Sequence, residues 1–341
     1  MPVTATTPRH NSPESKKSPE MCLLVLLLLL APVVASADDV LRLSSSLDAM
    51  GTTFTIVAYD KDRIRLQSAV DAAFVEAERI EALLSHYRKD SELSRVNRLA
   101  SAGPVQVGKE LFRLLLECAG YSQASDGAFD ITVGPLVKVW GFYRGSGRVP
   151  HRAEIRGALA RIGYRDLILD EAGQSVRFAK AGMEIDPGGI GKGYAVDRMA
   201  DVLRSAGVGS ALISGGGSSI YALGSPPGKN GWDVQIKDPK SPSRTIEELV
   251  LRDLSMSTSG NYEKFFVADG KTYSHIFDPR TGYPAQGVLS VSVVAPRTLD
   301  SEAWTKPVFV NGRRWATDHV PEGFRVYLCE DRMEQACAWL Q

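Results

Sequence analysis

The chain has 341 residues, with 40 Lys or Arg against 40 Asp or Glu, and 44% of its residues are hydrophobic. These globular values exclude a largely disordered chain and a fibrous one. The balanced charge also argues against a general nucleic-acid-binding protein, which needs a surplus of cations, so we expect no nucleic-acid partner. Four cysteines are too few for a disulfide-dense scaffold.

The N-terminal segment has the features of a cleaved export signal. A polar, basic stretch precedes an apolar run over residues 22–31 and then small residues up to Ala37. The apolar run is short for a hydrocarbon core of about 30 Å, so secretion is favoured over retention as a membrane anchor. We therefore expect a signal peptide over 1–37 and an exported, periplasmic domain over 38–341. Such a domain would meet a membrane only through its target or an uncleaved leader.

Hydrophobic periodicity and turn residues predict the elements of the first half of the mature chain. We expect a strand over 50–59, helices over 64–85 and 109–124, an ordered Gly-rich loop over 125–147, a short helix over 153–162 and a hairpin over 166–178.

The second half is richer in strands. We expect a helix over 193–206, a buried strand over 211–214, strands near 232–237, 246–252, 264–268, 288–294 and 324–328, and a closing helix over 330–340. The order is no regular βαβ alternation. It predicts an α+β fold with mixed or antiparallel sheets and packed helices, rather than a doubly wound sheet.

Three cysteines remain in the mature chain, namely Cys118, Cys329 and Cys337. An odd number allows at most one disulfide within the chain. Cys329 and Cys337 are the easier pair to join, but reduced cysteines in the core are equally expected.

The segment EIDPGGIGKGYAVD, residues 184–197, is the most informative for function. Glycines let a backbone approach an anion closely, a following helix start offers free N–H groups, and Lys192 adds a positive charge. The pattern suits a phosphate or diphosphate, although it is neither a Walker A loop nor G-x-G-x-x-G. A tight strand-to-helix turn is the equally weighted structural alternative. A second Gly cluster at 214–218 also follows a strand, and an ordinary bend explains it equally well. Two such loops around one helix together favour a nucleotide site.

Two further segments carry candidate chemistry. Residues 125–142 combine an acid, a tight turn and aromatic side chains, as a site for a planar ring requires. Residues 273–282 place His275, Asp278 and Arg280 on one turn. A lone histidine is more often structural, but this crowding of acid, base and guanidinium favours a functional role.

Together these segments resemble the ApbE-type FAD:protein FMN transferases, in the family's order, from Met50 to about Gly312. The matching motifs are MGTTF (50–54), SHY with SELS and Asn97 (85–97), DGAFDITVGPLVKVWGF (126–142), EIDPGGIGKGYAVD (184–197), ISGGGS (213–218), STSGNY (257–262) and SHIFDPRTGYP (274–284).

The resemblance implies a flavin-transferase fold and an exported enzyme that splits FAD. Such an enzyme attaches FMN through a phosphoester to Thr or Ser of an exported or membrane target protein and releases AMP. The family's acceptors resemble D-x-[ST]-G-A-[ST], and Mg²⁺ normally assists the reaction.

The resemblance also assigns site residues. FAD contacts fall on Met50, Tyr87, Ala128, Phe129, Asp130, Asp186, Lys192 and Ile276, and the backbone of Gly189 falls at the metal.

Elementary chemistry gives these positions roles. Lys192 would neutralise the diphosphate, while N–H groups near Gly191 and Gly193 would hold its oxygens. His275 is the candidate general base, with a pKa suited to neutral pH, and an acid near the metal is its rival.

Aromatic and acidic side chains have roles as well. Tyr87 and Phe129 would sandwich or edge the flavin ring. Asp130 and Asp186 would accept hydrogen bonds from ring or ribose groups, and their structural alternative is the capping of neighbouring turns.

The sequence departs from the family at its last metal motif, A-D-A-x-x-T before an apolar strand that ends in Gly. Counting back from Gly312 without a gap puts Glu302 at the Asp position and Lys306 at the Thr position. One inserted residue restores Thr305 but puts Ser301 in place of the Asp. We therefore expect Gly189, Glu302 and Thr305 as metal ligands, with Glu302 also counted as catalytic.

Lys306 makes this magnesium site doubtful. A lysine would repel a cation and could replace it, so we expect a weakened, altered or absent site and slow transfer, or a role for Lys306 as the charge. Two other functions stay open. One is a periplasmic FAD-binding protein with degenerate catalysis, and the other is an FAD pyrophosphatase that gives FMN and AMP.

Overall fold

The computed structural model describes residues 40–331 and 337–340. The expected signal peptide, residues 1–37, therefore lies outside the described residues. Within the described ranges, no helix combines the length and the apolar character that crossing a bilayer requires.

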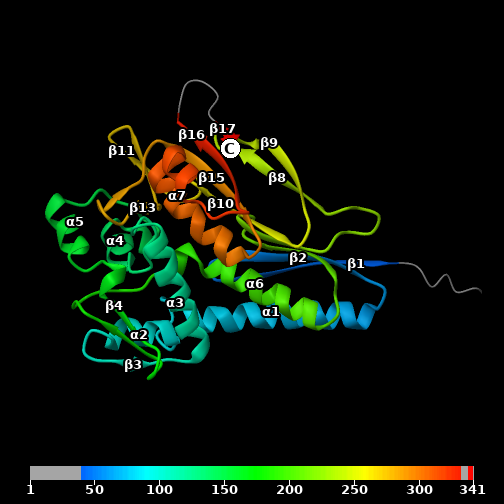
Figure 1. Cartoon of the computed structure of the whole chain (residues 1–341), viewed down its shortest axis with the longest axis horizontal. Helices are drawn as coiled ribbons and strands as arrows, with labels where there is room; N and C mark the ends of the chain where they lie inside the picture. Colours follow the sequence, from blue (N-terminus) through cyan, green and yellow to red (C-terminus); the bar gives the residue numbers. More distant parts are fainter. Residues whose placement is uncertain (1–39, 332–336, 341) are drawn as a thin grey trace, which may run out of the picture. The chain divides into compact units, whose positions relative to one another are not determined.

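The framework of the described part of the chain is an antiparallel sheet of eight strands (Figure 1). Every neighbouring pair in it is antiparallel. The order is β1 (Leu41–Ala49), β2 (Thr52–Asp60), β6 (Ser210–Gly215), β7 (Ser219–Leu223), β10 (Leu254–Gly260), β15 (Val288–Ala295), β16 (Arg325–Glu330) and β17 (Cys337–Trp339). The expected α+β class is confirmed, and this sheet is antiparallel rather than mixed.

Three helices pack on one face of this sheet: α1 (Arg63–Leu84), α6 (Gly191–Ser205) and α7 (Thr298–His319). The hairpin of β8 (Trp232–Asp238) and β9 (Ser241–Leu251) covers the other face. Side chains alternate between the faces, as the pleat of a strand requires. Phe54 and Ile56 of β2 are therefore buried on the helical side, whereas Met256 of β10 joins the core under the hairpin.

Smaller elements surround this framework. They are α2 (Glu92–Leu99), β3 (Val105–Gln106), α3 (Lys109–Ala124), α4 (Gly134–Val139), η1 (Phe142–Arg144), α5 (Arg152–Leu159), η2 (Tyr164–Asp166), β4 (Leu167–Asp170), β5 (Ser175–Phe178), η3 (Pro187–Gly189), β11 (Phe265–Ala268), β12 (Lys271–Ser274), β13 (Phe277–Asp278) and β14 (Tyr283–Pro284). Of these, β3, β5 and β4 form a small antiparallel sheet.

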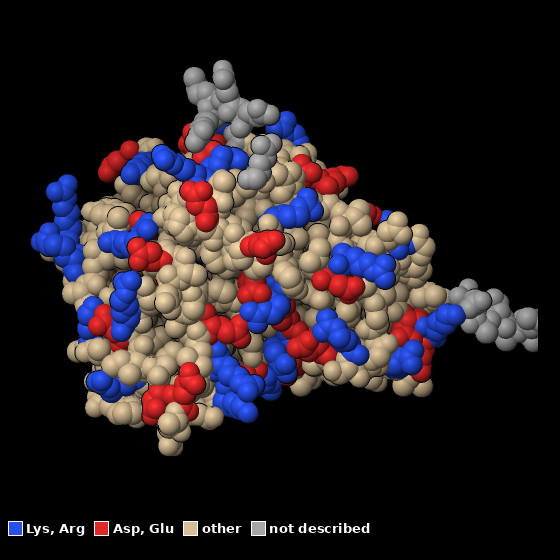
Figure 2. Space-filling model, in the orientation of Figure 1, with Lys and Arg blue, Asp and Glu red and all other residues tan. Residues whose placement is uncertain are grey.

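Ion pairs tie three of the helices together at the surface. Arg79 of α1 pairs with Glu76 on its own helix and with Glu110 of α3, and Arg198 of α6 also pairs with Glu76. Figure 2 shows cations and anions intermixed over the visible face. Ion pairs near the surface stabilise a fold only modestly, so burial of the apolar core contributes most of the stability.

Three expectations about local structure are wrong. Residues 125–147 are not all loop, because 134–139 form α4. The apolar run that ends at Gly312, for which the family's motif implies a strand, is helical here, because it belongs to α7, whose backbone leaves helical geometry at Gly312. The described residues at the two ends of the expected closing helix over 330–340 are not helical, because Glu330 ends β16 and 337–339 pair with β16 as β17. In the last two cases tertiary pairing and packing override the local pattern.

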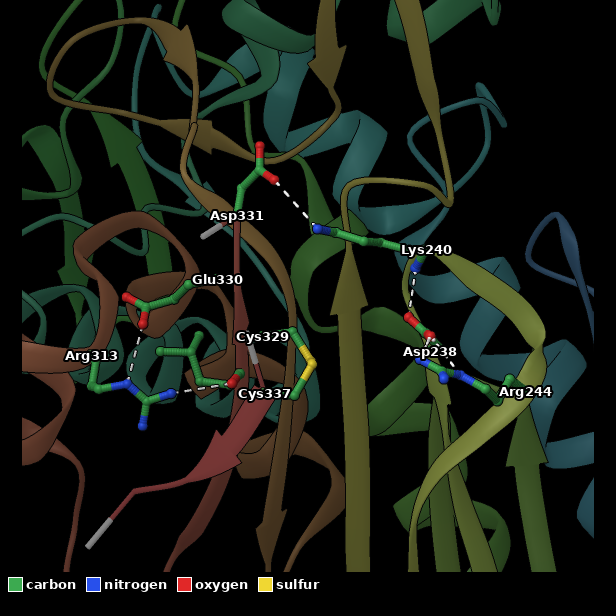
Figure 3. Close-up of a disulfide and its surroundings, with 9 residues drawn as sticks. Asp238, Lys240, Arg244, Arg313, Cys329, Glu330, Asp331 and Cys337 are labelled. Atoms are coloured by element: carbon green, nitrogen blue, oxygen red, sulfur yellow. Dashed lines mark hydrogen bonds and ion pairs between the residues drawn. A yellow bond between two sulfur atoms is a disulfide. The ribbon is translucent and has the colours of Figure 1, made fainter. Parts of the chain in front are cut away.

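A disulfide joins Cys329 of β16 to Cys337 of β17, at directly opposed positions of the two strands (Figure 3). This resolves the open question in favour of the bridge, and Cys118 remains a buried free thiol. Arg313 of α7 adds a nearby link, because its guanidinium pairs with Glu330 and donates to the carbonyl oxygen of Leu328.

Helices α6 and α7 cap each other's N-termini. The carboxylate of Asp197 in α6 accepts the backbone N–H groups of Thr298 and Leu299, at 2.7 and 2.8 Å. In return, the buried Glu302 of α7 accepts the backbone N–H of Gly193 in α6. Each carboxylate satisfies N–H groups that have no partner within their own helix. The two helix starts are thereby fixed against one another.

Substitution Asp197→Asn tests this exchange through pH. Burial raises the pKa of Asp197 from 3.8 to about 6, so folding takes up a proton between these pH values. The contribution of Asp197 to the free energy of unfolding therefore falls as pH rises from about 4 to about 6. Asparagine removes this contribution.

We expect the advantage of the wild type over Asp197→Asn to shrink by roughly 2 kcal/mol between pH 4 and pH 7. Urea unfolding at a series of pH values measures it. A constant difference across this range would contradict the assignment.

Candidate active site

The segment predicted as an anion cradle is a short turn into a helix. Asp186 opens it, η3 follows over Pro187–Gly189, and α6 begins at Gly191. The carboxylate of Asp186 accepts the N–H of Gly188 at 2.8 Å, and the N–H of Asp186 donates to the carbonyl oxygen of Ile131. The second bond joins the turn to the aromatic segment, so two motifs far apart in sequence lie side by side.

Two glycines of the turn are in close contact with other predicted site residues. A Cβ atom added to Gly189 would lie 3.4 Å from the ring of Phe129 and 3.6 Å from Cε of Lys306. A Cβ added to Gly191 would lie 3.2 Å from Cε of Met50. The turn therefore brings Met50, Phe129 and Lys306 together around its backbone.

The second Gly cluster meets the first through Lys192. The ammonium of Lys192 hydrogen-bonds to the hydroxyl of Ser218, and a Cβ on Gly215 would lie 3.5 Å from Cβ of Lys192. Ser218 was not predicted as a site residue. Its only signal was its place at the end of the motif ISGGGS.

Lys192 and Lys306 bring two positive charges to the turn. In the part of the chain that the structure describes, no carboxylate lies within ion-pair distance of either ammonium. Burial lowers the pKa of Lys306 to about 8, a shift that the charge of Glu302 opposes and that of Lys192 reinforces. Buried cations normally have an anionic partner. Because these two lysines have none within the described chain, we expect them to bind an anionic ligand.

His275 is close enough to Lys192 and Lys306 for their charges to affect its pKa. Its Nδ1 hydrogen-bonds to the carbonyl oxygen of Lys264 at 3.1 Å, which leaves Nε2 free to accept a proton. Burial lowers the pKa of His275 to about 4, and the charges of Lys306, Lys264 and Lys192 add to the shift. The expectation of a pKa suited to neutral pH is therefore wrong for the protein without ligand. A bound anion would raise this pKa, because it favours the protonated ring.

Asp130 and Asp186 both have the structural role that was their alternative. Asp130 is buried and accepts hydrogen bonds from the backbone N–H and hydroxyl of Thr132 and from the N–H of Tyr164. Burial raises its pKa despite these bonds. Asp186 caps η3 through Gly188. Both carboxylates thus hold turns in place, and their contacts with FAD remain predictions.

Tyr87 and Asp186 line a cavity of about 290 Å³. The ring of Tyr87 stacks on that of Tyr143, with 4.7 Å between the centroids, and the ring of His86 lies 4.1 Å from that of Tyr87. Both ring nitrogens of His86 are buried without a hydrogen-bond partner among the described residues. Neither residue was predicted as part of the site, although His86 lies within the SHY motif and Tyr143 directly follows the motif that ends at Phe142.

Two predicted contacts lie in the core. Ala128 is 1% exposed, and Ile276 is 4% exposed within the cluster that also packs against α7. Their side chains contribute to the packing around the site, and contact with FAD remains a prediction for both.

The predicted metal ligands on α7 diverge. Glu302 faces the turn and accepts the N–H of Gly193, so that N–H is not free for a phosphate oxygen, contrary to expectation. Thr305 instead faces the sheet, where its hydroxyl hydrogen-bonds to Ser259 of β10 at 2.7 Å. Ser257, which like Ser259 belongs to the STSGNY motif, hydrogen-bonds through its hydroxyl to Ser301 of α7. These buried hydroxyls position α7, which in turn positions Glu302 and Lys306.

Comparison with known proteins assigns the family. Residues 50–327 match the ApbE family, and the chain belongs to that family. The resemblance drawn from the motifs is confirmed.

The chain is 37% identical to an FAD:protein FMN transferase of Klebsiella pneumoniae, over 76% of this chain and 79% of that protein. It is 35% identical to one of Treponema pallidum, with 77% of each covered. Among solved structures, the ApbE protein of Thermotoga maritima matches with a TM-score of 0.80 and 32% identity, over 87% of this chain and 96% of that one. The flavin transferase ApbE of Vibrio cholerae matches with a TM-score of 0.76 and 28% identity, over 88% and 97%.

Substitution Gly193→Ala tests the close approach of α7 to α6. An added Cβ would lie 2.5 Å from the carbonyl oxygen of Thr298 and 2.8 Å from Oε2 of Glu302. We expect a loss of about 2 kcal/mol in the free energy of unfolding, typical of overpacking. Gly209→Ala is the matched control, because nothing lies within 4 Å of its added Cβ. Equal unfolding midpoints for both variants in urea would contradict this packing.

Proposed function

We propose that this protein is an FAD:protein FMN transferase. The observation that carries the proposal is the pair of half-buried lysines, Lys192 and Lys306, which meet at the glycine turn without a carboxylate partner among the described residues. The glycine turn lets an anion approach the backbone closely, and two ammonium groups lie beside it. This arrangement is complementary to a diphosphate. FAD contains a diphosphate, and the relatives' names state that they act on FAD.

The proposed reaction is a displacement at phosphorus. The hydroxyl oxygen of an acceptor Thr or Ser bonds to the FMN phosphorus, the bond from that phosphorus to the bridging oxygen breaks, and AMP leaves with the electron pair. The hydroxyl proton passes to a base, for which Nε2 of His275 is the candidate. Lys192 and Lys306 offset the charge that grows on the departing phosphate.

The residues present do not fit a magnesium site. Among the described residues, no group of three His, Cys, Asp or Glu gathers as metal ligands. Glu302 already accepts an N–H of α6, Thr305 faces the sheet, and Lys306 passes beside Gly189. A divalent ion about 4 Å from an ammonium would be repelled by roughly 8 kcal/mol at an effective dielectric constant of about 20. We therefore route no step through a metal.

We also propose that the protein acts outside the cytoplasm, on a target that carries a D-x-[ST]-G-A-[ST]-like segment. The leader-like residues 1–37 and the disulfide between Cys329 and Cys337 both support an oxidising compartment. The acceptor motif comes from the family resemblance.

The proposed role of Lys192 is tested by Lys192→Gln. We expect the affinity for FAD to fall at least tenfold, because a charge-assisted contact with the diphosphate is lost. Quenching of flavin fluorescence on titration measures it. Lys237→Gln, on an exposed position of β8, is the control and should bind FAD as the wild type does. Unchanged affinity in Lys192→Gln would refute the proposed site.

Incubation with FAD and an acceptor peptide separates the proposed function from its two rivals. Covalent FMN on the peptide together with AMP is the expected result. Free FMN together with AMP would indicate a pyrophosphatase instead. Bound, intact FAD would indicate a binding protein without transferase activity.

A further inference from the structure

Lys306 occupies the place beside the turn where the family resemblance puts a divalent cation. Its side chain runs along the backbone of Gly189, the predicted carbonyl ligand, with Cε 3.6 Å from the position of an added Cβ. Its ammonium donates to the backbone carbonyl oxygen of Glu302, one turn earlier in α7, at 2.9 Å. The side chain is therefore held in the site by its own helix.

The ammonium is not occupied by an internal salt bridge. Although Glu302 lies four residues before Lys306 in the same helix, its carboxylate accepts the N–H of Gly193 instead. Over residues 40–331 and 337–340, no carboxylate oxygen lies within 4 Å of Nζ of Lys306. An ammonium has three donors, and one of them bonds to Glu302, so two remain for oxygens of a ligand.

The helix that carries Lys306 is fixed from two sides. Hydroxyl groups of Ser301 and Thr305 bond to serines of β10 within the core, and Asp197 caps the start of the helix. A lysine on so constrained a helix stays beside the turn. Lys192 of α6 supplies the second charge, held by Ser218. Two fixed monocations together carry the charge of one divalent cation.

We propose that the ammonium of Lys306 takes the place of the divalent cation, so that FAD binding and FMN transfer in this protein need no divalent ion. This inference rests on the proposed function. The bonds formed and broken are those of the displacement already described, and the ammonium offsets the phosphate charge without giving up its proton.

The first test uses the full mature protein, FAD and an acceptor peptide with the D-x-[ST]-G-A-[ST]-like motif. We expect the rate of FMN transfer in excess EDTA to stay within twofold of the rate with added Mg²⁺. Calorimetric titration with Mg²⁺ alone should show no saturable binding. A rate that collapses in EDTA and returns with Mg²⁺ would overturn the inference while leaving the transferase intact.

Variants of Lys306 provide the second test. Lys306→Met should lower the transfer rate at least tenfold and weaken FAD binding, and Mg²⁺ should not restore either. Lys306→Arg should retain more activity because it keeps the charge, and Lys237→Met, an exposed lysine of β8, should match the wild type. A Lys306→Met enzyme as active as the wild type in EDTA would refute the role of the ammonium.

The third test reverses the departure from the family pattern. The double variant Glu302→Asp with Lys306→Thr places the family's Asp and Thr at these two positions, so that both offer oxygen ligands to a metal ion. We expect it to gain saturable Mg²⁺ binding and to transfer FMN at least tenfold faster with Mg²⁺ than in EDTA. If the folded double variant, checked by thermal melting, ignored Mg²⁺, the claim that Lys306 stands in for the ion would fail. Absence of FAD binding by the wild type in every condition would instead refute the proposed function, and the inference with it.

Discussion

The backbone N–H of Gly193 donates to Glu302, and the N–H groups of Thr298 and Leu299 donate to Asp197. This exchange fixes the start of α6 against the start of α7, and the glycine turn lies immediately before α6. Gly193 has no side chain because Thr298 and Glu302 fill the space in which one would lie. One glycine that resembles part of a phosphate loop thus serves helix packing.

The position of the two lysines follows from this arrangement. Lys192 lies in the first turn of α6, and Lys306 follows Glu302 by one turn in α7, so each is placed by a helix that the other helix holds. Serines of β10 hold α7 against the sheet, because their buried hydroxyls hydrogen-bond to Ser301 and Thr305. A site arranged in this way is preorganised, because its charges do not have to be gathered when an anion binds. Partial burial of both lysines strengthens their attraction for such an anion.

Local patterns predicted much of the molecule. The fold class, helix α1, helix α3 and the turn into α6 followed from periodicity and glycine placement, and the motifs gave the family. The missing contacts join distant segments. The Gly193–Glu302 bond spans 109 residues, and nothing in either motif indicates which N–H a carboxylate will cap.

The errors have physical causes as well. Val308, Phe309 and Val310 form an apolar, partly β-branched run that is typical of a strand, yet the residues before it are capped as a helix by Asp197. Residues 337–339 pair with β16, and Cys337 is bridged to it by a disulfide, which periodicity does not reveal. The pKa of His275 depends on burial and on charges from three other segments, so its residue type alone could not predict it.

The most direct test of the central claim is a crystal structure of the protein with FAD, grown in the presence of a chelator. We predict diphosphate oxygens within hydrogen-bond distance of both Nζ of Lys192 and Nζ of Lys306, with no metal ion beside Gly189. A diphosphate bound elsewhere, or an octahedral ion at Gly189 with Lys306 displaced from the turn, would contradict it.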